Sequence, residues 1–246
     1  MSSTPFQVLV FSRTVAYRHD SIPAGIEAIQ GLSKESSSSP TPFTVIATED
    51  PEVFTPSSLA RFRVVIFLQS SGEFLDTPEQ LDALKGFVRA GGGVVGVHCA
   101  SFALESSEWY GNLMGAVFKS HPPPSVERIR IVDPGHPIMA GSLPKGGSTN
   151  RAGTESLSEE PWQWKWLDEW YIFKQEPADI CSKVHVLVAG GLHGHDHPLA
   201  WCQEFDGGRS FYTSLGHFDE AYKDFAFLNQ LLSGILWTAG KAKIPS

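Results

Sequence analysis

The sequence predicts an α/β fold with a mostly parallel central sheet and helices on both faces. Residues 6–11, 63–68 and 94–97 are short, continuous runs of mostly apolar residues. Such runs are typical of strands that are buried on both faces of a sheet. Amphipathic segments lie between them, and this alternation of strand and helix is typical of a parallel sheet.

The first strand and the first helix follow directly from this pattern. Residues 6–11 are apolar and β-branched, which favours a buried strand. A helix is predicted at residues 22–32, where apolar residues recur at helical spacing. Asp20 or Ser21 can cap its first turn, and Pro23 suits that turn.

The next elements lead to a glycine run. Residues 43–47 and 63–68 predict strands, joined by a small connecting segment at 51–59. Residues 77–80 (Thr-Pro-Glu-Gln) are a strong helix start, with an N-cap, a proline and a capping-box glutamine. The glycines at 91–93 end that helix. They precede a strand, whereas a dinucleotide fingerprint follows one, so no nucleotide cofactor is expected.

The remaining elements complete a single domain, residues 1–246. Strands are predicted at residues 94–97, 125–132, 184–189, 199–205 and 209–215, and a last helix at 222–239. A mobile Ser/Pro loop is predicted at about 33–42 and an irregular excursion at about 141–165. A chain with 246 residues and 41% hydrophobic residues has enough apolar side chains for one sizeable core.

Charge and cysteine content exclude several classes of function. The net charge is −8 and no Lys/Arg cluster stands out, so we expect no nucleic-acid partner. No apolar run has the length of a membrane span, and the N-terminus lacks the features of a signal peptide. Three scattered cysteines make no disulfide framework, which favours a reducing, cytoplasmic location.

Several titratable side chains fall where predicted strands end. They are His19, His98 and His217, with His121 and either Asp168 or Glu169 from irregular segments. Loops at the carboxyl ends of parallel strands gather over one sheet edge, so these groups are expected to converge. Imidazoles with a carboxylate suit Zn²⁺ or a similar divalent metal. Without a metal the same groups suit acid–base catalysis, and any single histidine can instead be structural.

Other side chains are candidates for binding a substrate. Arg18 is expected to hold a sugar oxygen, or to form an ion pair with a nearby carboxylate. Tyr171 and Tyr212 can donate hydrogen bonds to a hydroxylated ligand. Trp109 and the tryptophans of residues 162–170 can stack on sugar rings, although aromatic side chains also serve ordinary packing.

A second histidine-rich stretch, residues 193–197, reads His-Gly-His-Asp-His. In an extended segment its three histidines share one face. The glycines at 190, 191 and 194 predict a flexible turn between two strands. We therefore expect a polar surface loop here and no metal site.

Four sequence blocks together carry a resemblance to a known family. They are residues 17–21 (YRHDS), 91–98 (GGGVVGVH), 168–171 (DEWY) and 208–217 (GRSFYTSLGH). In this order and spacing the chain resembles the ThuA-like (trehalose-utilisation) family, which has the flavodoxin-like, class I glutamine amidotransferase-like fold. The resemblance implies disaccharide metabolism, with a sugar or a 3-keto-glycoside as substrate and a sugar dehydrogenase as partner in the pathway.

The turn after the strand at residues 94–97 separates this chain from the glutamine amidotransferases. In those enzymes the turn reads Gly-x-Cys-x-Gly, whereas here His98 stands at the nucleophile position and Cys99 follows it. Thioester formation from glutamine is therefore not expected. His98, His217 and Glu169 are the predicted catalytic residues, and His19, His98, His121 and His217 the predicted metal ligands.

Two functions remain open at this stage. One is an enzyme of disaccharide metabolism that uses acid–base or metal-assisted chemistry. The other is a non-catalytic carbohydrate-binding or regulatory domain on an amidotransferase-like scaffold. The sequence also leaves open whether the chain forms a homo-oligomer.

Overall fold

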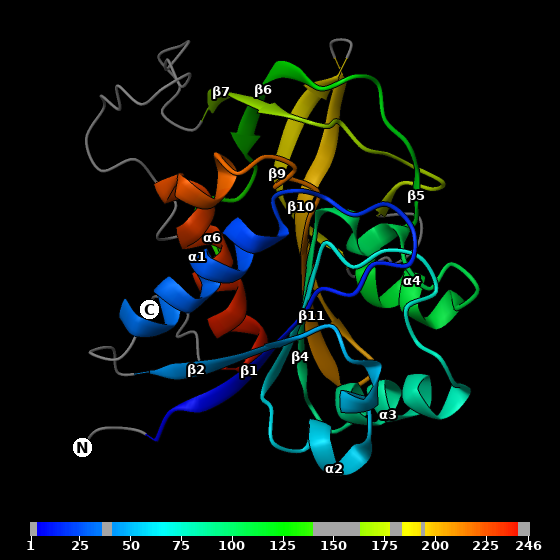
Figure 1. Ribbon diagram of the computed structural model, residues 1–246. Helices are drawn as coiled ribbons and strands as arrows, with labels where there is room; N and C mark the ends of the chain where they lie inside the picture. Colours follow the sequence, from blue (N-terminus) through cyan, green and yellow to red (C-terminus); the bar gives the residue numbers. More distant parts are fainter. Residues whose placement is uncertain (1–3, 36–40, 140–162, 178–183, 193–194, 241–246) are drawn as a thin grey trace.

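The computed structural model describes residues 4–35, 41–139, 163–177, 184–192 and 195–240 (Figure 1). The predicted loop at 33–42 and excursion at 141–165 lie mostly outside these residues. Regular structure extends a few residues into each of these two predicted segments. Helix α1 (Ile22–Glu35) continues past residue 32, because Leu32 is buried in the core. Strand β7 (Gln163–Asp168) already begins at Gln163, because it pairs with β6 from that residue.

In the described part of the chain, nine strands form one sheet in the order β2-β1-β3-β4-β11-β10-β9-β6-β7. These strands are β1 (Phe6–Phe11), β2 (Phe43–Thr48), β3 (Val64–Leu68), β4 (Gly93–Val97), β6 (Ser125–Ile131), β7, β9 (His185–Leu192), β10 (His195–Phe205) and β11 (Gly208–Thr213). A second, small sheet pairs β5 (Phe118–Ser120) with β8 (Ile172–Phe173).

The fold is α/β as predicted, but the large sheet is mixed. The strands from β2 to β11 pair in parallel, and those from β11 to β7 pair antiparallel. Parallel strands need a crossover of about a dozen residues or more, and only residues 206–207 separate β10 from β11. Asp206 and Gly207 have φ values of +47° and +91°, as a tight hairpin turn requires.

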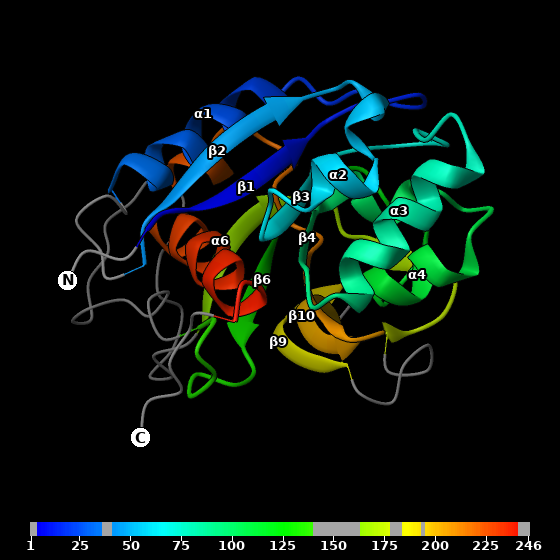
Figure 2. The ribbon, with the colours of Figure 1, turned by 90° about the horizontal axis from the view of Figure 1, so that it is seen from below.

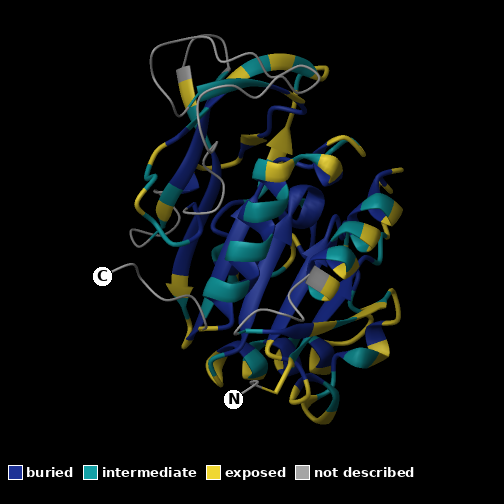
Figure 3. Ribbon diagram, turned by 90° about the vertical axis from the view of Figure 1, so that its left-hand side faces the viewer, coloured by how far each residue is buried: buried dark blue, intermediate teal, exposed yellow. Residues whose placement is uncertain are grey.

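Helices pack against the parallel strands (Figures 1 and 2). Along β1, Val8 and Val10 belong to a core cluster with α1 and α6 (Phe225–Thr238). Leu9 and Phe11 belong to a second cluster with α2 (Pro56–Leu59), α3 (Pro78–Arg89) and α4 (Glu108–Met114). The central strands are consequently buried along their whole length (Figure 3). Among the described residues, no helix has the length and apolar character to span a membrane.

The glycine run confirms the predicted cap and turn. Gly91 ends α3 with a φ of +88°, a conformation that favours glycine. A Cβ atom on Gly92 would lie 2.4 Å from the Phe87 ring, and one on Gly93 would lie 2.6 Å from the carbonyl oxygen of Thr238. The run therefore brings α3, β4 and α6 into close contact.

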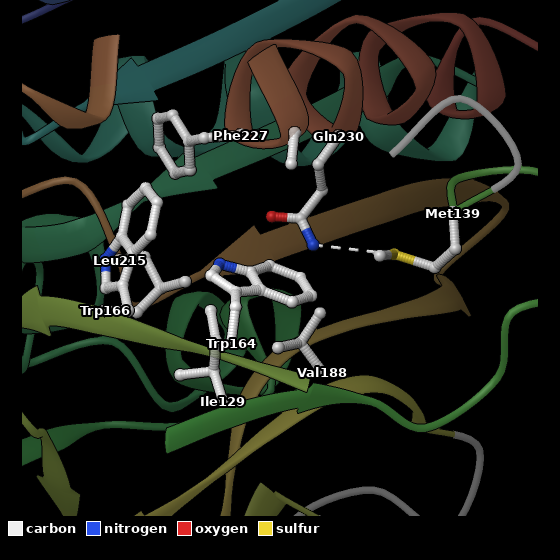
Figure 4. Close-up of a pocket in the computed structure, with 9 residues that line it drawn as sticks. Ile129, Met139, Trp164, Trp166, Val188, Leu215, Phe227 and Gln230 are labelled. Carbon is white, nitrogen blue, oxygen red and sulfur yellow. Dashed lines mark hydrogen bonds between the residues drawn. The ribbon is translucent and has the colours of Figure 1, made fainter. Parts of the chain in front are cut away.

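Two tryptophans of the aromatic stretch line an apolar pocket between the antiparallel strands and α6 (Figure 4). Trp164 and Trp166 meet Phe227 and Gln230 there, and the amide of Gln230 donates to the sulfur of Met139 at 3.5 Å. Trp166 is buried and packs its ring against Phe227. These tryptophans therefore serve packing.

The histidine-rich stretch at 193–197 lies between two antiparallel strands, as predicted, but the strands reach further into it than expected. His195 and His197 are part of β10 and pair with Leu192 and Gly190 of β9. Residues 193 and 194 lie outside the described residues. Asp196 of this segment also forms an ion pair of 2.6 Å with Arg130 of β6.

Candidate functional site

Three histidines lie beyond the carboxyl ends of parallel strands. His19 precedes α1, His98 follows β4 directly, and His217 comes four residues after β11. Parallel strands carry their carboxyl-end loops to the same sheet edge, which is where ligands bind in open α/β sheets. His19 and His98 are buried, and the His217 side chain is 17% exposed.

These histidines converge with Glu169, which follows β7. The Nε2 atom of His98 lies 3.1 Å from Nε2 of His19 and 3.4 Å from Nδ1 of His217. The carboxylate of Glu169 lies 3.3 Å from both His98 Nε2 and His217 Nδ1. One ligand atom from each of the four residues lies within 4.8 Å of all the others. We call this group the site cluster.

The backbone at His98 has an unusual conformation. His98 has a φ of +52°, which is uncommon for a residue with a side chain, and it begins a short 3-10 helix (His98–Phe102). The hydroxyl of Tyr212 donates to the His98 carbonyl at 2.7 Å and contacts Ser101 Oγ at 2.8 Å. Strained backbone of this kind is retained where surrounding contacts hold it, often at functional sites.

The contacts of His98 settle which ring nitrogen carries its proton. Nδ1 lies 2.6 Å from the carbonyl oxygen of Ser214, and a carbonyl can only accept. The proton is therefore on Nδ1, and in the neutral ring Nε2 presents a lone pair to the centre of the site cluster. The Tyr171 hydroxyl also points at this atom, at 2.9 Å.

The pKa shifts of His19 and Glu169 favour the forms that bind a cation, whereas that of His217 favours its protonated form. Burial, together with the neighbouring His98 and His217, lowers the pKa of His19 to about 3. Burial alone would raise the pKa of Glu169, but hydrogen bonds and charge from His217 and His98 outweigh it and lower the pKa. The pKa of His217 is raised because its contact with Glu169 outweighs its burial. A neutral imidazole and an ionised carboxylate are the forms that bind metals.

His121 lies beside the site cluster but outside the group of four. Its Nε2 atom is 3.5 Å from Glu169, and its side chain is one-third exposed. Its Nδ1 atom lies 2.9 Å from the carbonyl oxygen of Pro122, which fixes the proton there. The lone pair of the neutral ring is then on Nε2, which faces Glu169.

The structure does not bring the other predicted substrate-binding residues into an open site. Arg18 is exposed and pairs with Glu49 at 2.7 Å. Trp109 donates to Asp206 at 2.8 Å, in the turn that precedes β11, and so lies at the opposite sheet edge. Trp109 is thus placed away from the site cluster, because it belongs to α4 and bonds to the turn before β11. Tyr212 is fully buried and supports the His98 backbone.

A comparison with protein families gives a match over almost the whole chain. The family described as ThuA, trehalose utilisation, matches residues 7–238. The chain belongs to the ThuA family. Comparison with curated protein sequences gives no match.

Solved structures show the same fold for this ThuA-family chain. A ThuA-like protein from Bacteroides uniformis is 21% identical with a TM-score of 0.73, and the match covers 99% of this chain and 95% of that one. A ThuA-like protein from Parabacteroides merdae is 17% identical with a TM-score of 0.69, covering 99% and 93%. A β-galactosidase from Bacillus circulans is 15% identical with a TM-score of 0.57, covering 96% of this chain but 31% of that one. Family membership supports a carbohydrate-related role.

The thiol next to His98 is not an activated nucleophile in this ThuA-family chain. Cys99 is buried, and burial raises its pKa to about 12. Reactive cysteines instead have lowered pKa values and partial exposure. The residue after the elbow therefore does not take over the role of the amidotransferase cysteine.

Sequence reasoning missed Tyr17, which lies at the rim of the site cluster. Its side chain is 62% exposed, and its ring meets the His19 ring edge-on with centroids 4.7 Å apart. The loop beneath it is fixed, because the Tyr17 carbonyl accepts from Ser71 Oγ at 2.7 Å and the Val15 amide donates to Ser71 at 2.9 Å. Its place two residues before His19 was the only signal in the sequence.

Proposed function

We propose that this chain is a metal-dependent enzyme of disaccharide metabolism that cleaves a 3-keto-glycoside. The convergence of four ligand atoms at one sheet edge is the observation that carries the proposal. The carbohydrate role of the ThuA family supports the substrate class. The ketone would come from a sugar dehydrogenase that oxidises the disaccharide first. The free, buried thiols of Cys99 and Cys202 fit a cytoplasmic location.

The place of the site cluster in the sheet supports a ligand site. The parallel strands follow the order β2-β1-β3-β4-β11, and we take this order as that of a flavodoxin-like sheet. In that pattern ligands bind where the strand order reverses, between β1 and β3. His19 follows β1, and Gln69 follows β3 and contacts the Gly216 carbonyl beside His217.

The donors of the site cluster fit a divalent metal such as Zn²⁺. His98 offers a fixed Nε2 lone pair, and His19, His217 and Tyr171 all crowd around that one atom. One lone pair accepts one strong hydrogen bond, so three neighbours exceed its capacity, whereas a shared cation would engage the nitrogen and oxygen lone pairs together. When bound, a divalent ion would polarise the ketone of the substrate and stabilise developing negative charge.

His121 is the proposed general base, because His98 and His217 would be committed to ligation. Its Nε2 atom faces the site cluster and lies 3.5 Å from the Glu169 carboxylate. The one-third exposure of the ring places it where a substrate can reach. An imidazole beside a carboxylate is a common arrangement for proton transfer near neutral pH.

The proposed reaction is an elimination. A ketone at C3 acidifies the C2–H bond, and His121 takes this proton. The electron pair forms the C1–C2 double bond as the C1–O glycosidic bond breaks, and the leaving oxygen takes up a proton as an alcohol. Addition of water across the new double bond would complete hydrolysis. Tyr17 would stack on an apolar sugar face at the rim, as an exposed aromatic ring can.

Two measurements on purified protein test the proposal. We expect about one bound divalent metal per chain, and cleavage of 3-keto-trehalose that a chelator abolishes and Zn²⁺ restores. His98→Ala should remove both, while His185→Ala, an exposed histidine far from the site cluster, should retain both. Sugar binding without metal or turnover, unaffected by His98→Ala, would instead identify a non-catalytic carbohydrate-binding domain.

A further inference from the structure

Asp168 is a fully buried carboxylate that contacts two segments of the site cluster. We propose that Asp168 is a positioning residue that holds Glu169 and His217 at the spacing a metal ion requires. The inference rests on the metal site proposed above. It adds a residue that touches neither substrate nor ion.

The four hydrogen bonds of Asp168 all come from N–H donors. One oxygen accepts from the backbone amides of Glu169 at 2.9 Å and His217 at 3.2 Å. The other accepts from the amide of Gly216 at 2.8 Å and the Trp166 indole at 2.9 Å. Three of the four donors are therefore the backbone of the two ligand segments.

This arrangement joins ligands that are far apart in sequence. Glu169 follows an edge strand of the antiparallel half, and His217 follows the last parallel strand, 48 residues later. One carboxylate bridges their backbones. Glu169 and His217 can then both reach the His98 nitrogen only while that bridge is intact.

The turn at Gly216 and His217 is fixed from its other side as well. Gln69 Nε2 lies 2.7 Å from the Gly216 carbonyl oxygen, and Ser21 Oγ donates to the His217 carbonyl at 2.7 Å. Gly216 has a φ of +112°, and a Cβ atom there would lie 3.0 Å from the Tyr222 hydroxyl. The amides held by Asp168 join the backbone of this turn to the backbone of Glu169, beside the direct contact of 3.3 Å between the His217 and Glu169 side chains.

Asp168→Asn tests the inference with little change of volume. An amide side chain has one acceptor oxygen, so its NH₂ group would face two of the four N–H donors and could accept from neither. We expect Zn²⁺, added alone to metal-free protein and followed by calorimetry, to bind about 10- to 100-fold more weakly than to wild type, as for other groups that orient metal ligands. Co²⁺ in the same site should show a changed visible spectrum, because the ligand geometry changes.

Trp166→Phe is the matched control. It removes one of the four donors but leaves the three backbone bonds to the ligand segments. We expect it to lower the melting temperature while Zn²⁺ affinity and the Co²⁺ spectrum stay close to wild type. If Asp168 were purely structural, metal affinity would fall in proportion to stability in both Asp168→Asn and Trp166→Phe.

The outcomes separate this inference from the proposed function. If the wild-type protein binds no Zn²⁺ at the site cluster, the proposed metal site is refuted. If wild type binds and folded Asp168→Asn binds equally well, only the positioning role is overturned. Should Asp168→Asn not fold, Asp168→Ser, which leaves room for a water to accept from the amides, is measured instead, and unchanged affinity there overturns the inference.

Discussion

Two groups of histidines in this chain differ in what they can bind. The site cluster joins His19, His98, Glu169 and His217 at the carboxyl edge of the parallel strands. A second group, the far cluster, contains Asp133, His136, His185 and Cys202 around β9 and β10. The residue types of both groups are ones that bind zinc. In the described part of the chain, only the site cluster brings three or more ligand atoms together.

The difference lies in the hydrogen bonds behind each imidazole. The Nδ1 atom of His98 donates to the Ser214 carbonyl, which frees Nε2 to bind a cation. The Nδ1 atom of His136 instead accepts from the Ile138 amide at 3.2 Å, so its proton is on Nε2 and points toward Cys202 Sγ at 3.6 Å. The groups that orient a histidine therefore decide whether it is a ligand.

The largest expected effect comes from removing the central imidazole. His98→Ala takes away the one atom that His19, Glu169 and His217 all approach. We expect Zn²⁺ affinity and kcat/KM to fall by about 100-fold or more, since even groups that only orient ligands cost about 10- to 100-fold. His136→Ala in the far cluster should change neither by more than about twofold.

Calorimetry with Zn²⁺ and steady-state kinetics measure both variants. The proposed difference between the two clusters is refuted if His136→Ala lowers metal affinity as much as His98→Ala does. Both clusters would then bind metal, and the orientation of the imidazole protons would not be decisive.

Metal removal should lower stability only through the site cluster. A ligand bound to the folded state at about 100 times its Kd stabilises by about 2.7 kcal/mol. For a chain of this size that amounts to a Tm difference of about 5–10 °C between loaded and metal-free protein. Differential scanning calorimetry should show this difference in wild type and in His185→Ala, and no difference in His98→Ala.

The sequence predicts the site cluster because its histidines lie in the segments that follow predicted parallel strands. Strand ends are recognisable from apolar runs, and the parallel arrangement brings His19, His98 and His217 to one edge. The antiparallel pairing of the strands from β11 to β7 could not be recognised from the sequence in this way. Two residues separate β9 from β10 and β10 from β11, whereas about thirty separate β6 from β7. An apolar run does not reveal the direction of its neighbour.

Beyond the convergence of the histidines, individual side-chain contacts between distant segments could not be predicted. Asp168 and Glu169 are neighbours of the same chemical type, and nothing in the sequence tells which one faces the histidines. Trp109 was a candidate for the substrate site because its ring can stack on a sugar, yet it lies beside Asp206. Such assignments depend on side-chain direction, which strand and helix patterns leave undetermined.

Tyr212→Phe should have an intermediate effect, because it acts on His98 through the backbone. It removes the hydrogen bond of 2.7 Å to the His98 carbonyl and leaves that buried acceptor and Ser101 Oγ without this partner. Leaving a buried group unsatisfied costs about 1–3 kcal/mol of unfolding free energy. Urea unfolding should show this loss, together with a smaller fall in kcat than His98→Ala gives.

A tyrosine that contributes only to packing should lower stability without lowering kcat. Tyr110→Phe is the control, since its hydroxyl donates to the Ala100 carbonyl at 3.1 Å, two residues beyond His98. Equal losses of stability with unequal losses of kcat would support a role for Tyr212 at the elbow. Equal losses of both would reduce Tyr212 to packing.

A smaller effect is expected at the rim. Tyr17→Ala removes an exposed ring that contacts His19 but holds no ligand backbone. Aromatic contacts are worth about 0.5–1.5 kcal/mol, so KM for a 3-keto-disaccharide should rise about 2- to 10-fold with kcat nearly unchanged. Tyr17→Phe should restore the wild-type KM. A fall in kcat with unchanged KM would contradict a stacking role.

The smallest effect is expected for the thiol beside His98. Cys99 is buried with its pKa raised to about 12, so at neutral pH it is a thiol and not a thiolate. Cys99→Ala should leave Zn²⁺ affinity and kcat within about twofold of wild type, since a small apolar replacement disturbs the packing little. Glutamine-dependent ammonia release that disappears in Cys99→Ala would show the opposite. The amidotransferase elbow would then still act through its displaced cysteine, and the imidazole at position 98 would have a supporting role.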